Sequence, residues 1–151
     1  MLFRSAFVNP FQNAPLDMYS PEFYHRRRDA LERRLAVLRD GSVRDLLAVY
    51  DRLRGFTNAW VNWNAMDRDL LELALTRIPF AHLEAVWRRI LFDPAANRSG
   101  FPDLVVFPQT EDYVLVEVKG PGDSLQHNQK RWLRFFREHQ MPAEVAFVQW
   151  H

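Results

Sequence analysis

Two carboxylates and a lysine in the last third of the chain have the spacing of a small catalytic site. Asp103 lies in a short run rich in β-branched residues, and Glu117 and Lys119 lie in a second such run. If residues 108–112 connect the two runs as a hairpin, Asp103 lies directly opposite Glu117. Lys119 follows two residues later, so its side chain projects from the same face of the strand as that of Glu117.

Such a cluster could bind a metal ion. Two neighbouring carboxylates repel each other, and oxygen ligands suit a hard ion such as Mg²⁺ or Mn²⁺. That ion could hold a phosphate and activate a water molecule, while Lys119 orients the water and the carbonyl of Val118 supplies a further ligand. An exposed cross-strand pair beside a solvated lysine explains the same three residues, and the spacing alone does not decide.

The residues around the cluster favour the site. Val114, Val116 and Val118 alternate with the other positions of their strand, which predicts that their face is buried and that the opposite face is aimed at a ligand. Pro102, immediately before Asp103, disfavours helical geometry at this point of the chain. The break Gly120-Pro121-Gly122-Asp123-Ser124 then turns the chain into a helix and supplies its cap.

That helix carries one polar residue on an otherwise apolar stripe. The stripe has helical spacing and is expected to pack against the sheet; its members are Leu125, Gln129, Trp132 and Phe136. Gln129 is either a core glutamine bonded to backbone or a catalytic residue that holds water or phosphate. The basic residues Lys130, Arg131 and Arg134 lie away from the stripe and are candidate DNA contacts, although a solvated helix face explains them equally well.

The elements that must position these residues change in type along the chain. Up to about residue 93 the apolar spacing predicts helices, at about 22–39, 43–54, 65–76 and 80–92, with Ser20 capping the first. Beyond it the pattern predicts a β-β-α-β order, with strands at 101–107, 113–119 and 143–150 and a helix ending near residue 139. We therefore expect an irregular segment 1–21, a helical part 22–93 and a core 94–151, together forming one compact domain.

Composition excludes several classes of protein. Hydrophobic residues make up 48% and charged residues 26% of the 151 residues, which argues against disorder. No apolar run is long enough for a membrane span, no signal peptide is evident, and the chain has no cysteine. The net charge of +1 does not by itself indicate a nucleic-acid partner.

Two strings of sequence resemble a known family. They are Arg98-Ser99-Gly100-Phe101-Pro102-Asp103-Leu104-Val105-Val106 and Leu115-Val116-Glu117-Val118-Lys119-Gly120-Pro121-Gly122-Asp123, and they are similar to the VRR-NUC branch of the PD-(D/E)xK nucleases. More narrowly, they resemble the C-terminal catalytic domain of the Fanconi-associated nucleases. The resemblance implies a restriction-endonuclease-like α+β core, a mixed sheet flanked by helices, with an inserted helical subdomain.

The resemblance also implies an activity and roles for residues. It implies Mg²⁺- or Mn²⁺-dependent cleavage of DNA near a 5′ flap, or digestion from a 5′ end, in interstrand crosslink repair. Asp103 and Glu117 would be metal ligands, Lys119 the catalytic lysine and Arg98 a phosphate contact. The extra helices favour a monomer, and the compartment would be the cytoplasm or nucleoid of a bacterium or the nucleus of a eukaryote.

One departure leaves alternatives open. Members of the family carry a further metal-binding glutamate upstream of the segment that resembles residues 7–17, so we expect this chain to be the C-terminal part of a longer enzyme. Glu84 is a weak substitute for that glutamate. The alternatives are a non-catalytic DNA-binding or interaction module on a nuclease fold, a stand-alone junction-resolving nuclease, and a sequence-specific restriction-type or homing nuclease.

Overall fold

The computed structural model describes residues 13–56, 59–109 and 112–149, and the chain divides into two compact units. The first comprises Met1–Thr76 with Leu91–Asp93, and the second comprises Arg77–Ile90 with Pro94–His151. Within the described residues, no helix combines the length and apolar character needed to cross a membrane. The predicted division at residues 21 and 93 stays a prediction.

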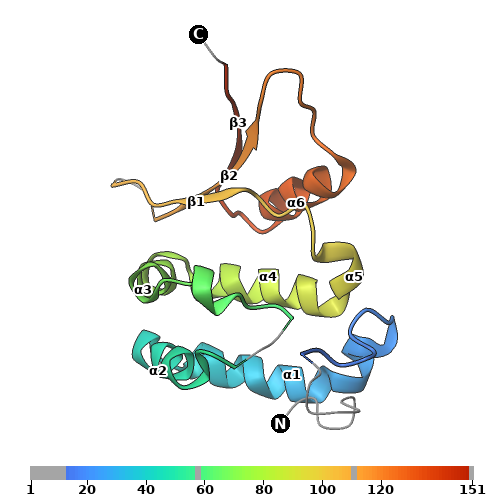
Figure 1. Cartoon of the computed structure of the whole chain (residues 1–151), viewed down its shortest axis with the longest axis vertical. Coiled ribbons are helices and arrows are strands. Elements are labelled where there is room, and N and C mark those ends of the chain that lie inside the picture. Colours follow the sequence, from blue (N-terminus) through green and yellow to red (C-terminus); the bar gives the residue numbers. More distant parts are fainter. Residues whose placement is uncertain (1–12, 57–58, 110–111, 150–151) are drawn as a thin grey trace. The chain divides into compact units, whose positions relative to one another are not determined.

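The first unit is built from helices, close to where the apolar spacing predicts them. They are α1 (Glu22–Asp40), α2 (Val43–Leu53), the 3₁₀ turn η2 (Trp63–Ala65) and α3 (Arg68–Arg77); the three α-helices are labelled in Figure 1. Gly55 follows α2 with a positive φ of 92°, a backbone conformation that glycine adopts readily at the end of a helix. Helix α3 begins later than predicted because the carboxylate of Asp67 accepts the N–H groups of Asp69 and Leu70, both at 2.9 Å.

The predicted cap of α1 is wrong. The hydroxyl of Ser20 is buried and makes no hydrogen bond in the described part of the chain; its backbone carbonyl accepts the N–H of Phe23 at 3.1 Å instead. Helix α1 is tied to the preceding segment by Arg27, whose two terminal nitrogens donate to the two oxygens of Asp17 at 2.7 and 2.9 Å. These bonds hold the pKa of Asp17 below its usual range.

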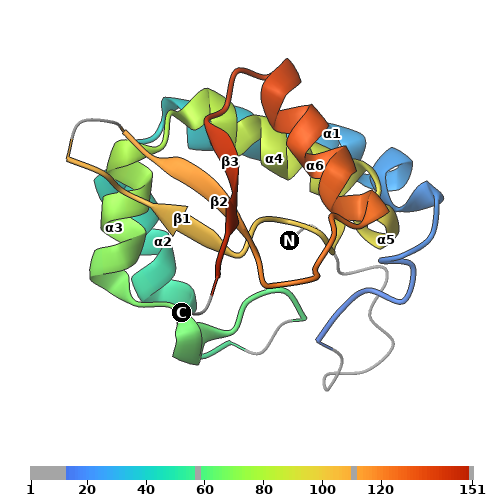
Figure 2. The ribbon, with the colours of Figure 1, turned by 90° about the horizontal axis from the view of Figure 1, so that it is seen from above.

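The second unit contains a three-stranded mixed sheet. Its elements are α4 (Phe80–Phe92, which continues into the first unit), α5 (Pro94–Asn97), β1 (Leu104–Val106), β2 (Val114–Lys119), α6 (His127–Glu138) and β3 (Ala143–Phe147). Figure 2 shows the strands side by side in the order β1, β2, β3. Strand β1 pairs with β2 in antiparallel fashion and β3 pairs with β2 in parallel, so the predicted mixed sheet is confirmed.

Helix α6 covers one face of this sheet and forms the core. Tyr113 and Leu115 pack there with Trp132 and Phe136, which are 1% and 0% exposed. Because side chains alternate along a strand, Glu117 and Lys119 point to this same face. The predicted choice of buried face is therefore wrong: the covered face of β2 carries Leu115 and the catalytic candidates, although Val116 on the other face is also buried.

Candidate active site

The hairpin brings Asp103 to the strand that carries Glu117. Strand β1 pairs with β2 in the predicted register, with Leu104 opposite Val116. Asp103 directly precedes β1, and its Oδ2 accepts the backbone N–H of Val118 at 2.9 Å. The hydrogen bond fixes the Asp103 carboxylate beside the strand, one residue from Glu117.

Glu117 and Lys119 form a buried pair at the end of β2. Their exposed fractions are 1% and 7%, and the ammonium of Lys119 lies 2.7 Å from Oε1 of Glu117. The side-chain amide of Gln129 on α6 donates a hydrogen bond to the same oxygen. An isolated buried carboxylate is costly, and these two donors offset that cost. They also hold the carboxylate in one orientation.

Gln129 is itself held at its other end. Its Oε1 accepts the backbone N–H of Gln126 at 2.9 Å, as part of the capping box that begins α6. The helix therefore starts at His127, and the prediction that the break at 120–124 supplies its cap is wrong. A side chain bonded at both ends cannot rotate freely, so Gln129 ties the first turn of α6 to Glu117.

The turn that follows β2 has its own support. The carboxylate of Asp123 accepts the N–H of Gly120 at 3.0 Å, and the N–H of Asp123 donates to the carbonyl of Gly120 at 3.1 Å. Pro121 and Gly122 are the two central residues of this turn. Gly122 has a φ of +83°, and proline followed by a glycine with positive φ is typical of a type II turn. This turn ends β2 directly after Lys119.

A second tie joins α6 to the segment that leads into Asp103. Gly100 has a φ of +83°, and a Cβ built on it would lie 2.8 Å from the backbone carbon of Asn128 and 2.9 Å from the nitrogen of Gln129. The side chain of Asn128 donates to the hydroxyl of Ser99 at 3.2 Å. The segment can approach α6 this closely because residue 100 has no side chain. The contact of Gly100 with α6 therefore positions Asp103, three residues later in the chain, relative to Gln129.

The oxygen atoms of the site fit a hard divalent cation. In an extended strand the N–H and C=O of one residue point to the same side, so the carbonyl of Val118 is directed toward the side of Asp103, as its N–H is. Both side-chain contacts of the Glu117 carboxylate end on Oε1. Asp103, Glu117 and the Val118 carbonyl are oxygen donors of the type that Mg²⁺ and Mn²⁺ prefer.

A third acidic ligand is not at hand in the described part of the chain. No group of three or more His, Cys, Asp or Glu side chains suited to a metal ion occurs among those residues. Glu84 forms an ion pair with Arg88, one turn along α4, at 2.8 Å. The described residues therefore supply two carboxylates and a carbonyl.

The predicted DNA-contacting residues lie in different surroundings. Arg98 is exposed directly after α5, and Lys130 and Arg134 are exposed on α6. Arg131 is half-buried, and its guanidinium reaches the side-chain oxygen of Asn97 at 3.4 Å. Arg131 thus contacts another part of the protein, whereas Lys130 and Arg134 face solvent.

Sequence reasoning missed the residues that brace the site from behind. Arg89 on α4 stacks over the rings of Trp132 and Phe135, 4.5 Å from each centroid, and donates to the side chain of Asn97 at 3.1 Å. Burial lowers the pKa of Arg89 below its ordinary value. Asn97 in turn donates to the carbonyl of Arg89 at 3.1 Å. A lone asparagine before Arg98 gave no sign of this role, whereas Gly100 could have been noticed as a glycine beside a motif.

Tyr113, directly before β2, belongs to the core and is bonded to His82 of α4. The hydroxyl of Tyr113 lies 2.8 Å from Nδ1 of His82. Burial raises the pKa of Tyr113 to about 12 and lowers the pKa of His82. Both shifts favour the neutral forms, which suits a hydrogen bond inside a protein. Five residues, 114–118, separate Tyr113 from Lys119 along the chain.

Comparison with known proteins assigns the family. Residues 39–150 match the model of the VRR-NUC domain, and this range contains Asp103, Glu117, Lys119 and Gln129. The chain belongs to the VRR-NUC domain family. The resemblance seen in the two sequence strings is thereby confirmed.

Relatives within the VRR-NUC family include the Fanconi-associated nucleases. The chain is 47% identical over 148 residues to the Fanconi-associated nuclease 1 homolog of Pseudomonas aeruginosa, with 97% of this chain and 26% of that protein covered. It is 38% identical over 148 residues to Fanconi-associated nuclease 1 of Danio rerio, with 94% and 15% covered. The chain thus spans about a quarter or less of the length of these relatives.

Solved structures show the same fold. Two crystal structures of paFAN1, one bound to DNA with a two-nucleotide 5′ flap and a gap and one with a one-nucleotide flap, each match with a TM-score of 0.89 and 46% identity. Each match covers 97% of this chain and 27% of the paFAN1 chain. The restriction-endonuclease-like α+β fold predicted from the sequence is confirmed.

Proposed function

We propose that this chain carries the catalytic centre of a divalent-metal-dependent nuclease that cuts branched DNA at or near a 5′ flap. The observation that carries the proposal is the convergence of Asp103, Glu117 and Lys119 at the end of β2. Support comes from the VRR-NUC family and from paFAN1, whose crystal structures hold 5′-flap DNA.

The protein side of the reaction follows from the arrangement. Asp103, Glu117 and the carbonyl of Val118 would hold Mg²⁺ or Mn²⁺, which when bound would supply Lewis-acid activation of phosphate and water. Lys119 lies where its ammonium can orient the attacking water and add positive charge beside the phosphate. Gln129 keeps Oε1 of Glu117 engaged, so Oε2 is the oxygen of this carboxylate that would remain to hold the ion.

DNA is held by cations around this centre. We assign phosphate contacts to Arg98, Lys130 and Arg134, which are exposed. Arg131 acts indirectly, because its guanidinium contacts Asn97 behind the site. The substrate reaches the protein in a compartment that contains DNA, and the working form is a monomer that takes part in interstrand crosslink repair.

Cleavage of a labelled 5′-flap oligonucleotide tests the proposal. The protein is expected to cut the flap substrate in Mg²⁺ or Mn²⁺, to cut a flap-free duplex much more slowly, and to cut neither after chelation with EDTA. Lys119→Ala is expected to remove cleavage while the circular dichroism spectrum stays that of the parent. Cleavage that persists in EDTA would contradict the proposal.

One observation favours a second candidate, a DNA-binding module without cleavage. The described residues supply two carboxylates where a third acidic ligand would strengthen metal binding. Such a module would bind flap DNA in a salt-dependent way, with no effect of Mn²⁺ and no product at high protein concentration. Salt-dependent binding without product would select this candidate.

A further inference from the structure

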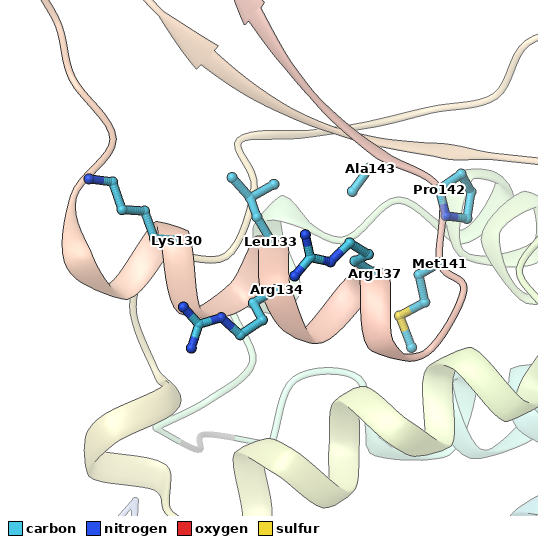
Figure 3. A pocket seen from close by; sticks show the side chains of 7 residues that line it. All are labelled: Lys130, Leu133, Arg134, Arg137, Met141, Pro142 and Ala143. Carbon is cyan, nitrogen blue, oxygen red and sulfur yellow. The ribbon is translucent and has the colours of Figure 1, made fainter.

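Three basic side chains form one stripe along α6. Lys130, Arg134 and Arg137 are spaced by four and three residues, which places them on the same side of a helix, and all three are exposed. Figure 3 shows them following one another along α6. At a rise of about 1.5 Å per residue the stripe is about 10 Å long. Each strand of a duplex carries one phosphate per ~3.4 Å of helix axis, so a stripe of this length can face more than one phosphate of a DNA strand.

The stripe borders a groove with an apolar floor. Besides the three cations, the groove is lined by Leu133 of α6, by Met141 and Pro142 after the helix, and by Ala143 at the start of β3. None of these described lining residues is acidic. The groove therefore offers positive charge along its rim and hydrocarbon at its base.

The basic stripe begins on the turn of α6 that contacts the candidate active site. Lys130 directly follows Gln129, the residue bonded to Glu117, and Arg134 and Arg137 continue the stripe away from it. Arg131 does not belong to the stripe, because its guanidinium turns to Asn97. A strand that leaves the site along the stripe would meet the three cations in succession.

We propose that this groove holds the single-stranded arm of the branched DNA substrate, with phosphates on Lys130, Arg134 and Arg137 and sugars and bases on the apolar floor. The inference rests on the proposed function, because the strand it holds is continuous with the strand at the active site. A single strand fits better than a duplex, since its base faces are free to contact apolar side chains.

Binding of two DNA molecules without divalent metal tests the inference. One is a junction with a 5′ flap of about twelve nucleotides, and the other is the same junction without the flap. The double variant Arg134→Glu/Arg137→Glu is expected to bind the flap DNA about tenfold more weakly, with a much smaller loss for the flap-free DNA. The salt slope for flap DNA should fall by about 1.4, at about 0.7 per lost contact with a single strand.

Matched variants control for folding and total charge. Arg28→Glu/Arg33→Glu reverses two exposed arginines on α1 and should leave both affinities unchanged. Arg134→Gln/Arg137→Gln removes charge without adding any and should show the same preference for flap DNA with a smaller loss. Equal loss on both DNA molecules, or no loss on either, would overturn the inference. The proposed function is judged separately, by cleavage in Mn²⁺, which this binding experiment does not require.

Discussion

Helices α2 and α6 both begin with a capping box, and the two boxes differ in one useful way. In α2, Asp45 accepts the N–H of Ser42 at 2.9 Å, and Ser42 accepts the N–H of Asp45 at 3.2 Å. In α6, Gln129 accepts the N–H of Gln126 at 2.9 Å. Gln129 then donates to Glu117 through the other end of its amide.

The difference lies in what remains after the cap is made. The carboxylate of Asp45 has acceptors only, and its charge suits the N-terminus of a helix. The amide of Gln129 carries no charge, but after its oxygen has accepted the N–H of Gln126 its NH₂ group can still donate a hydrogen bond, which the buried carboxylate of Glu117 accepts. The box of α2 therefore stabilises a helix, whereas the box of α6 stabilises a helix and also orients a candidate metal ligand.

The largest expected effect comes from removing the carboxylate of Glu117, which is bonded to Gln129 of the α6 capping box. Glu117→Ala should lower cleavage of flap DNA by at least about a thousandfold, because the stabilisation that a bound metal ion provides is worth several kcal/mol. Turnover by this variant and by Asp45→Ala, measured side by side, checks the prediction. Asp45→Ala should cut as fast as the parent below its melting temperature.

Substitution of two glycines with positive φ, Gly100 and Gly55, distinguishes an effect on the active site from general backbone strain. Gly100→Ala should lower cleavage by about a hundredfold, since a displacement of about 1 Å near reacting groups can cost that much. Its new Cβ would meet the backbone of Asn128 and Gln129. Gly55→Ala bears a similar strain at φ +92° with nothing within 4 Å, so it should lower the melting temperature and leave turnover unchanged.

If both glycine variants cut at the parental rate, then the contact of Gly100 with α6 does not position the site. A parallel loss of turnover in both would point to general destabilisation instead.

Breaking each box at one residue compares them directly. Gln129→Ala should lower cleavage by about tenfold and raise the Mn²⁺ concentration needed for half-maximal rate, as removal of a group that supports a metal ligand does. Ser42→Ala should lower the melting temperature without changing the Mn²⁺ requirement. If Gln129→Ala has the Mn²⁺ requirement of the parent, then the α6 box caps the helix without supporting the metal ligand.

The smallest effect is in the response to acid. Hydrogen bonds from the Ser42 side chain and backbone hold the pKa of Asp45 below its usual range. A carboxyl with a lowered folded pKa contributes stability above its unfolded pKa, and the contribution is lost as pH falls through the folded value. The box of α6 contains no titrating group. The amide proton shift of Ser42 should therefore change below about pH 4, while that of Gln126 does not follow the same titration.

Much of the fold could be predicted because local patterns decide it. Helix α4 lies where the apolar spacing puts it, and the hairpin register follows from one assumed connection. The site could be predicted as far as that register reaches, from Asp103 to Glu117. Its residues were assigned chemical roles by motif, and those roles stay predictions.

The remainder depends on contacts between distant segments. Nothing near Ser124 shows that the cap of α6 is made at Gln126, because the cap needs Gln129, which Glu117 also holds. The covered face of β2 was assigned wrongly because both of its faces carry apolar residues, so alternation alone could not choose. The face that becomes covered is the one on which Trp132 and Phe136 of α6 pack.

Cleavage of 5′-flap DNA by Asp103→Ala tests the central claim most directly. Asp103 is exposed and its contact is with one backbone N–H, so its loss should leave the fold intact. The parent is expected to cut in Mn²⁺ and the variant to produce no product above background, with unchanged binding of the DNA in the absence of metal. An Asp103→Ala protein that cuts as fast as the parent would show that the site lies elsewhere.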